Sequence, residues 1–289
     1  MSPSLPSLLV SHWQLDWALD LPAALYGGLY LAGAQRVRGS WPIGRTLSFL
    51  AGIACVLVAL QSGLNSFDDR RMSVHMIQHM LLLMLAPLLL LGGRPVILAL
   101  RTLPRSCRPG LARMLQRTRL VTGPLPCLAI FYAVVLLTHL PAFYDATLRQ
   151  PPLHQAEHAL YLVAGLLLWW PILDGDPVPA QRLGGLGRIG YMLAAMPPMA
   201  IVGAYLNRHA TLVYPAYAAP GRALRISPLT DQANAGAIMW VAGNLMMVAV
   251  GLWAAIAALL AEERRQQARD ARGAGESLRD AAAGGGLSI

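Results

Sequence analysis

Two pairs of histidines stand four residues apart in the sequence, His75 with His79 and His154 with His158. In an α-helix, residues four apart lie on one face, one turn from each other. Each pair could therefore offer two imidazole nitrogens to a single ion, as zinc-binding helices do. A fifth histidine, His139, closes another apolar run. The first chemistry that these residues indicate is metal binding.

Other side chains near the histidines add to the set of possible ligands. Met76 and Met80 are interleaved with the first pair, Glu157 precedes His158, and Asp231 opens a late apolar segment. Imidazole binds zinc, copper, iron and nickel, whereas thioethers favour Cu(I). We therefore predict copper, as Cu(I), with haem or zinc as alternatives. The predicted metal ligands are His75, His79, His139, His154, His158, Met76, Met80, Glu157 and Asp231.

The segment 154–158 also spells H-x-x-E-H, the inverted zinc-protease motif. In that interpretation Glu157 is a general base beside a zinc-bound water, and the protein is a membrane metallohydrolase. The match covers five residues, and no further acidic ligand follows at a familiar spacing. We favour a protein that is not an enzyme and has no catalytic residues. Glu157 would then hold an imidazole in place or bind the metal itself.

The composition identifies the elements that must position these residues. Of the 289 residues, 56% are hydrophobic and only 13% are charged, and the mean hydropathy is +0.49. A soluble domain carries about a quarter charged residues, so a soluble enzyme, a disordered chain and a fibrous repeat are excluded. We predict an all-α integral membrane protein with seven transmembrane helices, at about 21–35, 43–62, 74–93, 122–140, 154–173, 186–206 and 233–261.

The arginines give this domain an orientation. The chain has no lysine, and 17 of its 23 arginines fall in the first, third and fifth loops and the C-terminal tail. Lys and Arg concentrate in cytoplasmic loops, so we predict the N-terminus outside and the C-terminus in the cytoplasm. Residues 1–20 form an external segment, 21–261 the membrane domain and 262–289 a flexible cytoplasmic tail. In this topology all seven histidines fall at or near the outer face.

The net charge of +9 has the same explanation. There is no soluble basic domain to bind nucleic acid, so we predict a lipid bilayer and no nucleic acid among the partners. Ionisable groups inside apolar segments are costly and usually point into the bundle. We therefore expect the histidine pairs to converge near the outer membrane surface.

Several stretches resemble one known family. The run VHMIQHMLL at 74–82 is similar to the hallmark segment of the CtaG-type cytochrome c oxidase assembly factors of bacteria. The likeness continues with THLP at 138–141, HQAEH at 154–158 and Asp231-Gln232, and it covers about residues 20–260.

The resemblance implies a multi-pass protein of the bacterial plasma (inner) membrane, required for maturation of a haem–copper oxidase. The five histidines named above match those of the family. The implied partners are cytochrome c oxidase subunits and a periplasmic or extracellular copper donor. We predict a copper-binding assembly factor that delivers its ion from the outer face. A haem-binding membrane protein and a membrane metallohydrolase stay open as alternatives.

Overall fold

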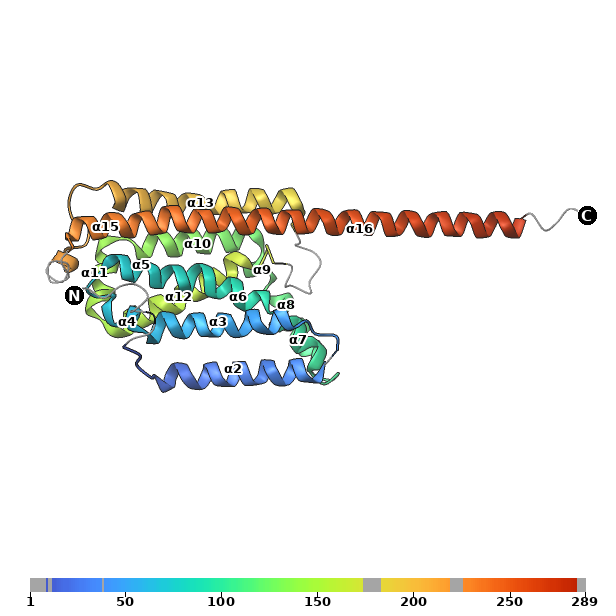
Figure 1. Ribbon diagram of the computed structural model, residues 1–289, viewed down its shortest axis with the longest axis horizontal. Helices are drawn as coiled ribbons and strands as arrows, with labels where there is room; N and C mark the ends of the chain where they lie inside the picture. Colours follow the sequence, from blue (N-terminus) through green and yellow to red (C-terminus); the bar gives the residue numbers. More distant parts are fainter. Residues whose placement is uncertain (1–8, 10–11, 38, 174–182, 219–225, 285–289) are drawn as a thin grey trace, which may run out of the picture.

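The computed structural model describes residues 9, 12–37, 39–173, 183–218 and 226–284. Within these ranges all regular structure is helical, as predicted. Figure 1 shows the long helices running side by side along one axis, with one helix projecting far beyond the others. Residues 1–8 and 10–11 of the predicted external segment and the last five of the tail lie outside the described residues.

The helices follow the predicted apolar segments. In chain order they are α2 (Trp17–Arg36), α3 (Ile43–Gln61), α4 (Gly63–Phe67), α5 (Met72–Met80), η1 (Leu81–Leu85), α6 (Ala86–Gly92), α7 (Pro95–Thr102), α8 (Arg108–Arg117), α9 (Arg119–Thr122), α10 (Pro124–Thr138), α11 (Pro141–Arg149), α12 (Pro151–Trp169), α13 (Gly185–Arg208), η3 (Pro215–Tyr217), α15 (Pro228–Ala237), η4 (Ile238–Gly243) and α16 (Asn244–Gly284).

Four helical segments among the described residues are long and apolar enough to cross a membrane, namely Ile43–Phe67, Met72–Thr102, Gly185–Arg208 and Pro228–Asp270. A fifth is added if α10 and α11, which meet at a bend of 73°, form one broken span. These candidate spans support the prediction of a membrane protein, whereas seven spans and the orientation of the termini remain predictions. The helices α2 and α12 occupy the other two predicted segments, but neither is apolar enough to count as a candidate span. In α12 the first turns carry the polar residues His154, Glu157 and His158, which lower its hydropathy.

Both ends of the chain differ from the predicted boundaries. α2 begins at Trp17, inside the predicted external segment, because the Asp16 side chain accepts a hydrogen bond of 2.9 Å from the amide of Ala18 and caps the helix. At the other end α16 continues to Gly284, well beyond the point where the sequence predicts a flexible tail. This is the helix that projects from the bundle in Figure 1.

Two π-helical turns interrupt the helices that begin at the histidine-bearing end of the bundle. One, η1, joins α5 to α6, and the other, η4, joins α15 to α16. Such turns occur often at functional sites. α12 packs closely against η1, because Gly165 lacks a Cβ that would meet the carbonyl oxygen of Leu83 and the ring of Pro87. This close contact holds the two histidine-bearing helices together.

Candidate metal centre

The first histidine pair lies on α5. The turn at 68–71 leads into this helix, whose first residue is Met72. His75 and His79 are both fully buried, and their ring centroids are 4.0 Å apart. The predicted spacing on one helical face is therefore confirmed, and the rings point into the bundle rather than toward lipid.

The second pair lies on α12, which begins with Pro151 in its first turn. The rings of His154 and His158 have centroids 4.2 Å apart. The ring of His154 stacks on that of His75 at 5.1 Å, and the ring of His158 lies 5.6 Å from that of His79. The predicted convergence of the two pairs is therefore seen in the structure.

The side chains form two overlapping groups, in each of which one ligand atom per residue lies within 4.8 Å of all the others. We name them by their distinguishing members. The helix set consists of His75, His79, His154 and Glu157. The turn set consists of Asp68, His154 and His158. Both sets combine imidazole nitrogens with one carboxylate, a mixture that zinc and copper accept.

Many polar atoms of these side chains are buried without a hydrogen-bond partner in the described part of the chain. They are both ring nitrogens of His75 and of His79, Nε2 of His139, His154 and His158, Oδ2 of Asp68 and both carboxylate oxygens of Glu157. Leaving a buried donor or acceptor unsatisfied costs about 1–3 kcal/mol, and native structures contain few such atoms. Their concentration in one place fits a bound cation.

The two imidazole–carboxylate contacts among these side chains are longer than hydrogen bonds. His79 Nε2 and Glu157 Oε2 are 4.0 Å apart, and His154 Nε2 and Asp68 Oδ2 are 3.7 Å apart. An ion between each pair could bind both atoms, whereas neither pair makes a direct hydrogen bond.

His139 lies beside the two sets without belonging to either. It ends α10, and its Nδ1 is 2.8 Å from the carbonyl oxygen of Val135. The backbone oxygen of His139 accepts a hydrogen bond from the Tyr214 hydroxyl at 2.8 Å. Its Nε2 has no hydrogen-bond partner within the described ranges, which leaves this atom available to an ion.

Asp231 belongs to neither set, and the two predicted methionine ligands pack among apolar residues. Met76 is fully buried in the main hydrophobic core, and the sulfur of Met80 lies beside Gly243 of η4. The carboxylate of Asp231 accepts hydrogen bonds from the amide and hydroxyl of Ser73, and Arg71 Nε lies 3.5 Å from it. The packing and bonding of these side chains favour structural roles.

Sequence reasoning missed Asp68 as a candidate ligand. It lies in the turn before α5, among charged neighbours that suggest a solvated loop. Instead it is buried, and burial raises the pKa of Asp68 to about 7, although its carboxylate accepts a hydrogen bond from the amide of Asp69. Its position seven residues before His75 was the one available signal.

Buried tyrosines surround the histidines, and the sequence did not reveal them either. The ring of Tyr161 lies 4.2 Å from that of His79, and the ring of Tyr144 lies 5.1 Å from that of His75. Tyr214 stacks on Tyr144 at 3.9 Å, and the Tyr217 hydroxyl donates to the backbone oxygen of Asp68 at 2.9 Å. These rings exclude water from the site and hold the 68–71 turn in place.

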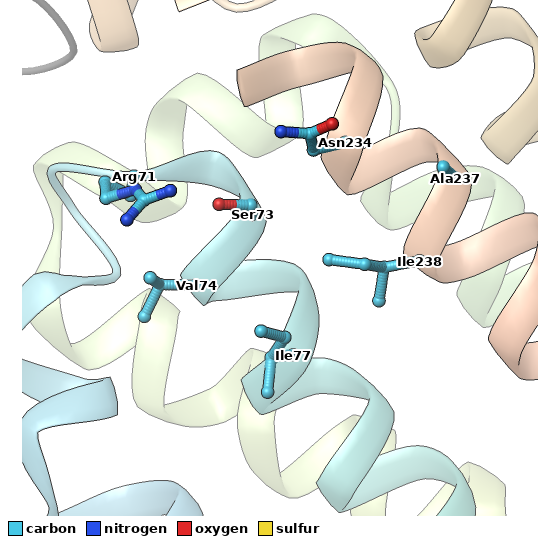
Figure 2. A pocket seen from close by; sticks show the side chains of 7 residues that line it. All are labelled: Arg71, Ser73, Val74, Ile77, Asn234, Ala237 and Ile238. Carbon is cyan, nitrogen blue, oxygen red and sulfur yellow. The ribbon is translucent and has the colours of Figure 1, made fainter. Parts of the chain in front are cut away.

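A separate cavity of about 370 Å³ lies between α5 and α15 (Figure 2). Arg71, Ser73 and Ile77 line it from α5 and its approach, while Asn234 and Ile238 line it from α15 and η4. None of the five histidines lines this cavity. It is therefore distinct from the candidate metal centre.

Comparison with known proteins identifies the family. The model of the cytochrome c oxidase caa3 assembly factor family (CtaG) matches residues 28–260. The chain belongs to this family. The predicted resemblance is therefore confirmed, and the matched range contains all five histidines of the candidate centre, together with Asp68 and Glu157.

The CtaG-family chain also has curated relatives in mycobacteria. An uncharacterized protein of Mycobacterium tuberculosis is 32% identical over 274 residues, which cover 90% of this chain and 40% of that protein. An uncharacterized protein of Mycobacterium leprae is 31% identical over 270 residues, covering 89% of this chain and 40% of the relative. The chain thus spans about 40% of the length of these relatives. A search of solved structures finds no significant match.

Proposed function

We propose that this CtaG-family protein binds copper(I) as cargo in the histidine cluster and delivers it to a cytochrome c oxidase during assembly. The observation that carries the proposal is the set of unpartnered buried nitrogens and oxygens on α5 and α12. A packed hydrophobic bundle would not retain so many unsatisfied polar atoms without a ligand to bind them. A cation bound by one ligand atom from each residue of a set would satisfy several of them at once.

The chemistry of the site favours copper over hard cations. Magnesium and calcium prefer sets made of oxygen ligands, whereas the helix set offers three imidazoles and a single carboxylate. Neutral imidazoles suit copper and zinc. The family description, which concerns assembly of a haem–copper oxidase, favours copper of these two.

The proposed cargo site lies near the outer membrane surface of a seven-span protein in the bacterial plasma membrane. The arginine distribution supports an external N-terminus and a cytoplasmic C-terminus. The two weaker spans, α2 and α12, support the full set of seven because they expose apolar side chains. On α2 these include Leu25 and Leu29, and on α12 Leu160 and Val163. Such faces suit contact with lipid chains.

The proposed partners follow from this location. A copper donor on the outer side would load the site, and an oxidase subunit would receive the ion. The helix set and turn set together offer six side chains, more than the four ligands that a tetrahedral site needs. Surplus ligands allow an ion to be released one ligand at a time, as a carrier protein requires. This function needs no catalytic residue.

The geometry gives less support to the two alternatives. The ring of His75 lies 5.1 Å from that of His154 and 6.4 Å from that of His158, and Tyr144 packs against it, so a small ion fits this crowded cluster better than a porphyrin. For a hydrolase, Glu157 would need access to water and substrate, but it is 1% exposed and faces His79. Both observations favour binding over catalysis.

Copper analysis of the purified protein tests the proposal. The full chain in detergent is loaded with Cu(I) without oxygen, and bound copper is measured by elemental analysis. Loss of a group that merely supports a ligand lowers metal affinity 10–100-fold, so replacing both His75 and His79 by Ala should lower it more than about 100-fold. His209→Ala, at the end of α13, is the matched control.

The same variants are then expressed in a bacterium that lacks the gene, and the copper content of its oxidase is measured. The double variant should leave the oxidase deficient in copper, whereas His209→Ala should restore it. Wild-type copper binding and wild-type oxidase copper in the double variant would together refute the proposal. An absorption band of haem in the purified protein would favour the haem-binding alternative instead.

A further inference from the structure

His154 is the one residue that belongs to both ligand sets. It is also the member through which the buried cluster reaches the surface. The side chain of His154 is 18% exposed, against 6% for Asp68 and zero for His79 and Glu157. An ion that enters the cluster from outside therefore meets His154 first.

Building on the proposed function, we infer that the two sets are successive stations for one copper(I) ion. The turn set receives the ion, and the helix set then holds it. During the transfer His154 stays bound, Asp68 and His158 leave, and His75, His79 and Glu157 take their places. Two copper–ligand bonds break and three form, and copper remains monovalent because no electron moves.

The turn set is suited to the first step by its position. Asp68 precedes α5, outside the membrane-spanning helices, and its backbone oxygen is held by the Tyr217 hydroxyl. Oδ2 of Asp68 is unpartnered and lies 3.7 Å from His154 Nε2. A fixed turn, and not a flexible loop, therefore directs the carboxylate toward the partly exposed imidazole.

The helix set is suited to the second step by its burial and ligand number. It offers four ligands where the turn set offers three, and both His79 and Glu157 are shielded from solvent. A four-ligand tetrahedral site is complete. The additional ligand favours movement of the ion inward.

Both stations present the same charge to the ion. Each set contains one carboxylate, from Asp68 or from Glu157, and otherwise only imidazoles, which bind metals in the neutral form. Uncompensated charge is costly in a buried environment. The ion exchanges one carboxylate for another, so the net charge of the ion and its bound ligands is the same at both stations. The ring of His154 lies 4.2 Å from that of His158 and 5.1 Å from that of His75, so the step is short.

Separate measurements of loading rate and final affinity test this inference. The purified full chain is mixed with Cu(I) held by a chromophoric chelator, and both the rate of uptake and the equilibrium are followed. Asp68→Asn should slow loading about tenfold or more while the final copper content stays near that of the wild type. Glu157→Gln should load at the wild-type rate but hold copper about tenfold or more weakly.

Two further variants control for folding and for charge. Asp69→Asn alters the neighbouring carboxylate, which is 64% exposed, and should behave as wild type. Asp68→Glu keeps a carboxylate at the turn and should retain faster loading than Asp68→Asn. Circular dichroism confirms that each variant keeps its helix content.

The outcomes separate the inference from the function on which it rests. Wild-type loading in a folded Asp68→Asn protein would overturn the two stations while leaving copper binding intact. Equal losses of rate and affinity in Asp68→Asn and Glu157→Gln would indicate a single site and overturn them as well. A wild-type protein that takes up no copper would refute both the proposed function and the inference.

Discussion

The carboxylate of Asp231 on α15 accepts hydrogen bonds from both the backbone amide and the hydroxyl of Ser73 on α5. Arg71 Nε adds an ionic contact at 3.5 Å. Asp231 thus fastens α15 to the first turn of the helix that carries His75 and His79. The sequence alone suggested a metal ligand at this position, whereas these contacts give the carboxylate a structural task.

Replacing Asp231 by Ala should therefore destabilise the protein with little effect on copper binding. The change leaves the amide and hydroxyl of Ser73 without their acceptor and Arg71 without its anion, at a cost of about 1–3 kcal/mol. Thermal unfolding in detergent should show a lower midpoint, and copper content should remain near wild type. Asp270→Asn, on the exposed part of α16, should change stability by less than about 0.5 kcal/mol. Loss of copper at an unchanged midpoint would make Asp231 a ligand after all.

A methyl group at position 165 should damage both stability and the site. In Gly165→Ala the added Cβ meets the backbone carbonyl of Leu83 and the rigid side-chain ring of Pro87, neither of which can move aside easily. Overpacking of this kind costs about 1–3 kcal/mol, and it should push α12 away from η1 and weaken copper binding. The matched control is Gly28→Ala on α2, where nothing lies within 4 Å of the added atom. Equal midpoints for the two variants would show that the contact is not tight.

The metal-free protein should lose stability as the pH rises through about 7, because of Asp68. Burial raises the pKa of this carboxyl from 3.8 to about 7. A raised pKa contributes stability that is fully present below the unfolded value and is lost as the pH rises through the folded value. Asn cannot ionise, so the unfolding midpoint of Asp68→Asn minus that of wild type should increase between about pH 4 and pH 7. The measurement is thermal unfolding with a chelator present.

Asp270→Asn provides the baseline for that experiment, because Asp270 lies on the exposed part of α16, far along the chain from Asp68. Its midpoint should follow that of wild type at every pH. A constant difference between Asp68→Asn and wild type across this range would contradict the prediction.

Removing the hydroxyl of Tyr161 should have a small effect on stability and on the cluster. This hydroxyl lies 2.6 Å from Thr138 Oγ1 and 3.4 Å from His139 Nδ1, while the ring packs against His79. Tyr161→Phe keeps the ring, so the expected loss is about 1 kcal/mol of stability, and an equal loss of binding free energy would lower copper affinity by less than about tenfold. Tyr205→Phe, where the side chain is half-exposed, serves as the control. A loss of all bound copper in Tyr161→Phe would show that the hydroxyl contacts the ion.

The sequence alone predicted the helical membrane architecture and the family, because both depend on local features. Hydropathy is a property of each segment, and the spacing of His75 with His79 and of His154 with His158 sets their common helical face. The weak hydropathy of α12 comes from the residues that form the candidate centre. The same residues of α12 therefore indicate a metal site and make this helix hard to recognise as a membrane span.

Tertiary structure alone decided which side chains meet. Asp68 joins the histidines, and Asp231 pairs with Ser73, because helices distant in the sequence pack side by side and bury one carboxylate near imidazoles and the other near an amide and a guanidinium. Likewise Gly165 matters only because η1 lies against it. Composition and spacing fix the face on which a residue stands. The neighbour on that face depends on how the helices are packed, which a single sequence does not reveal.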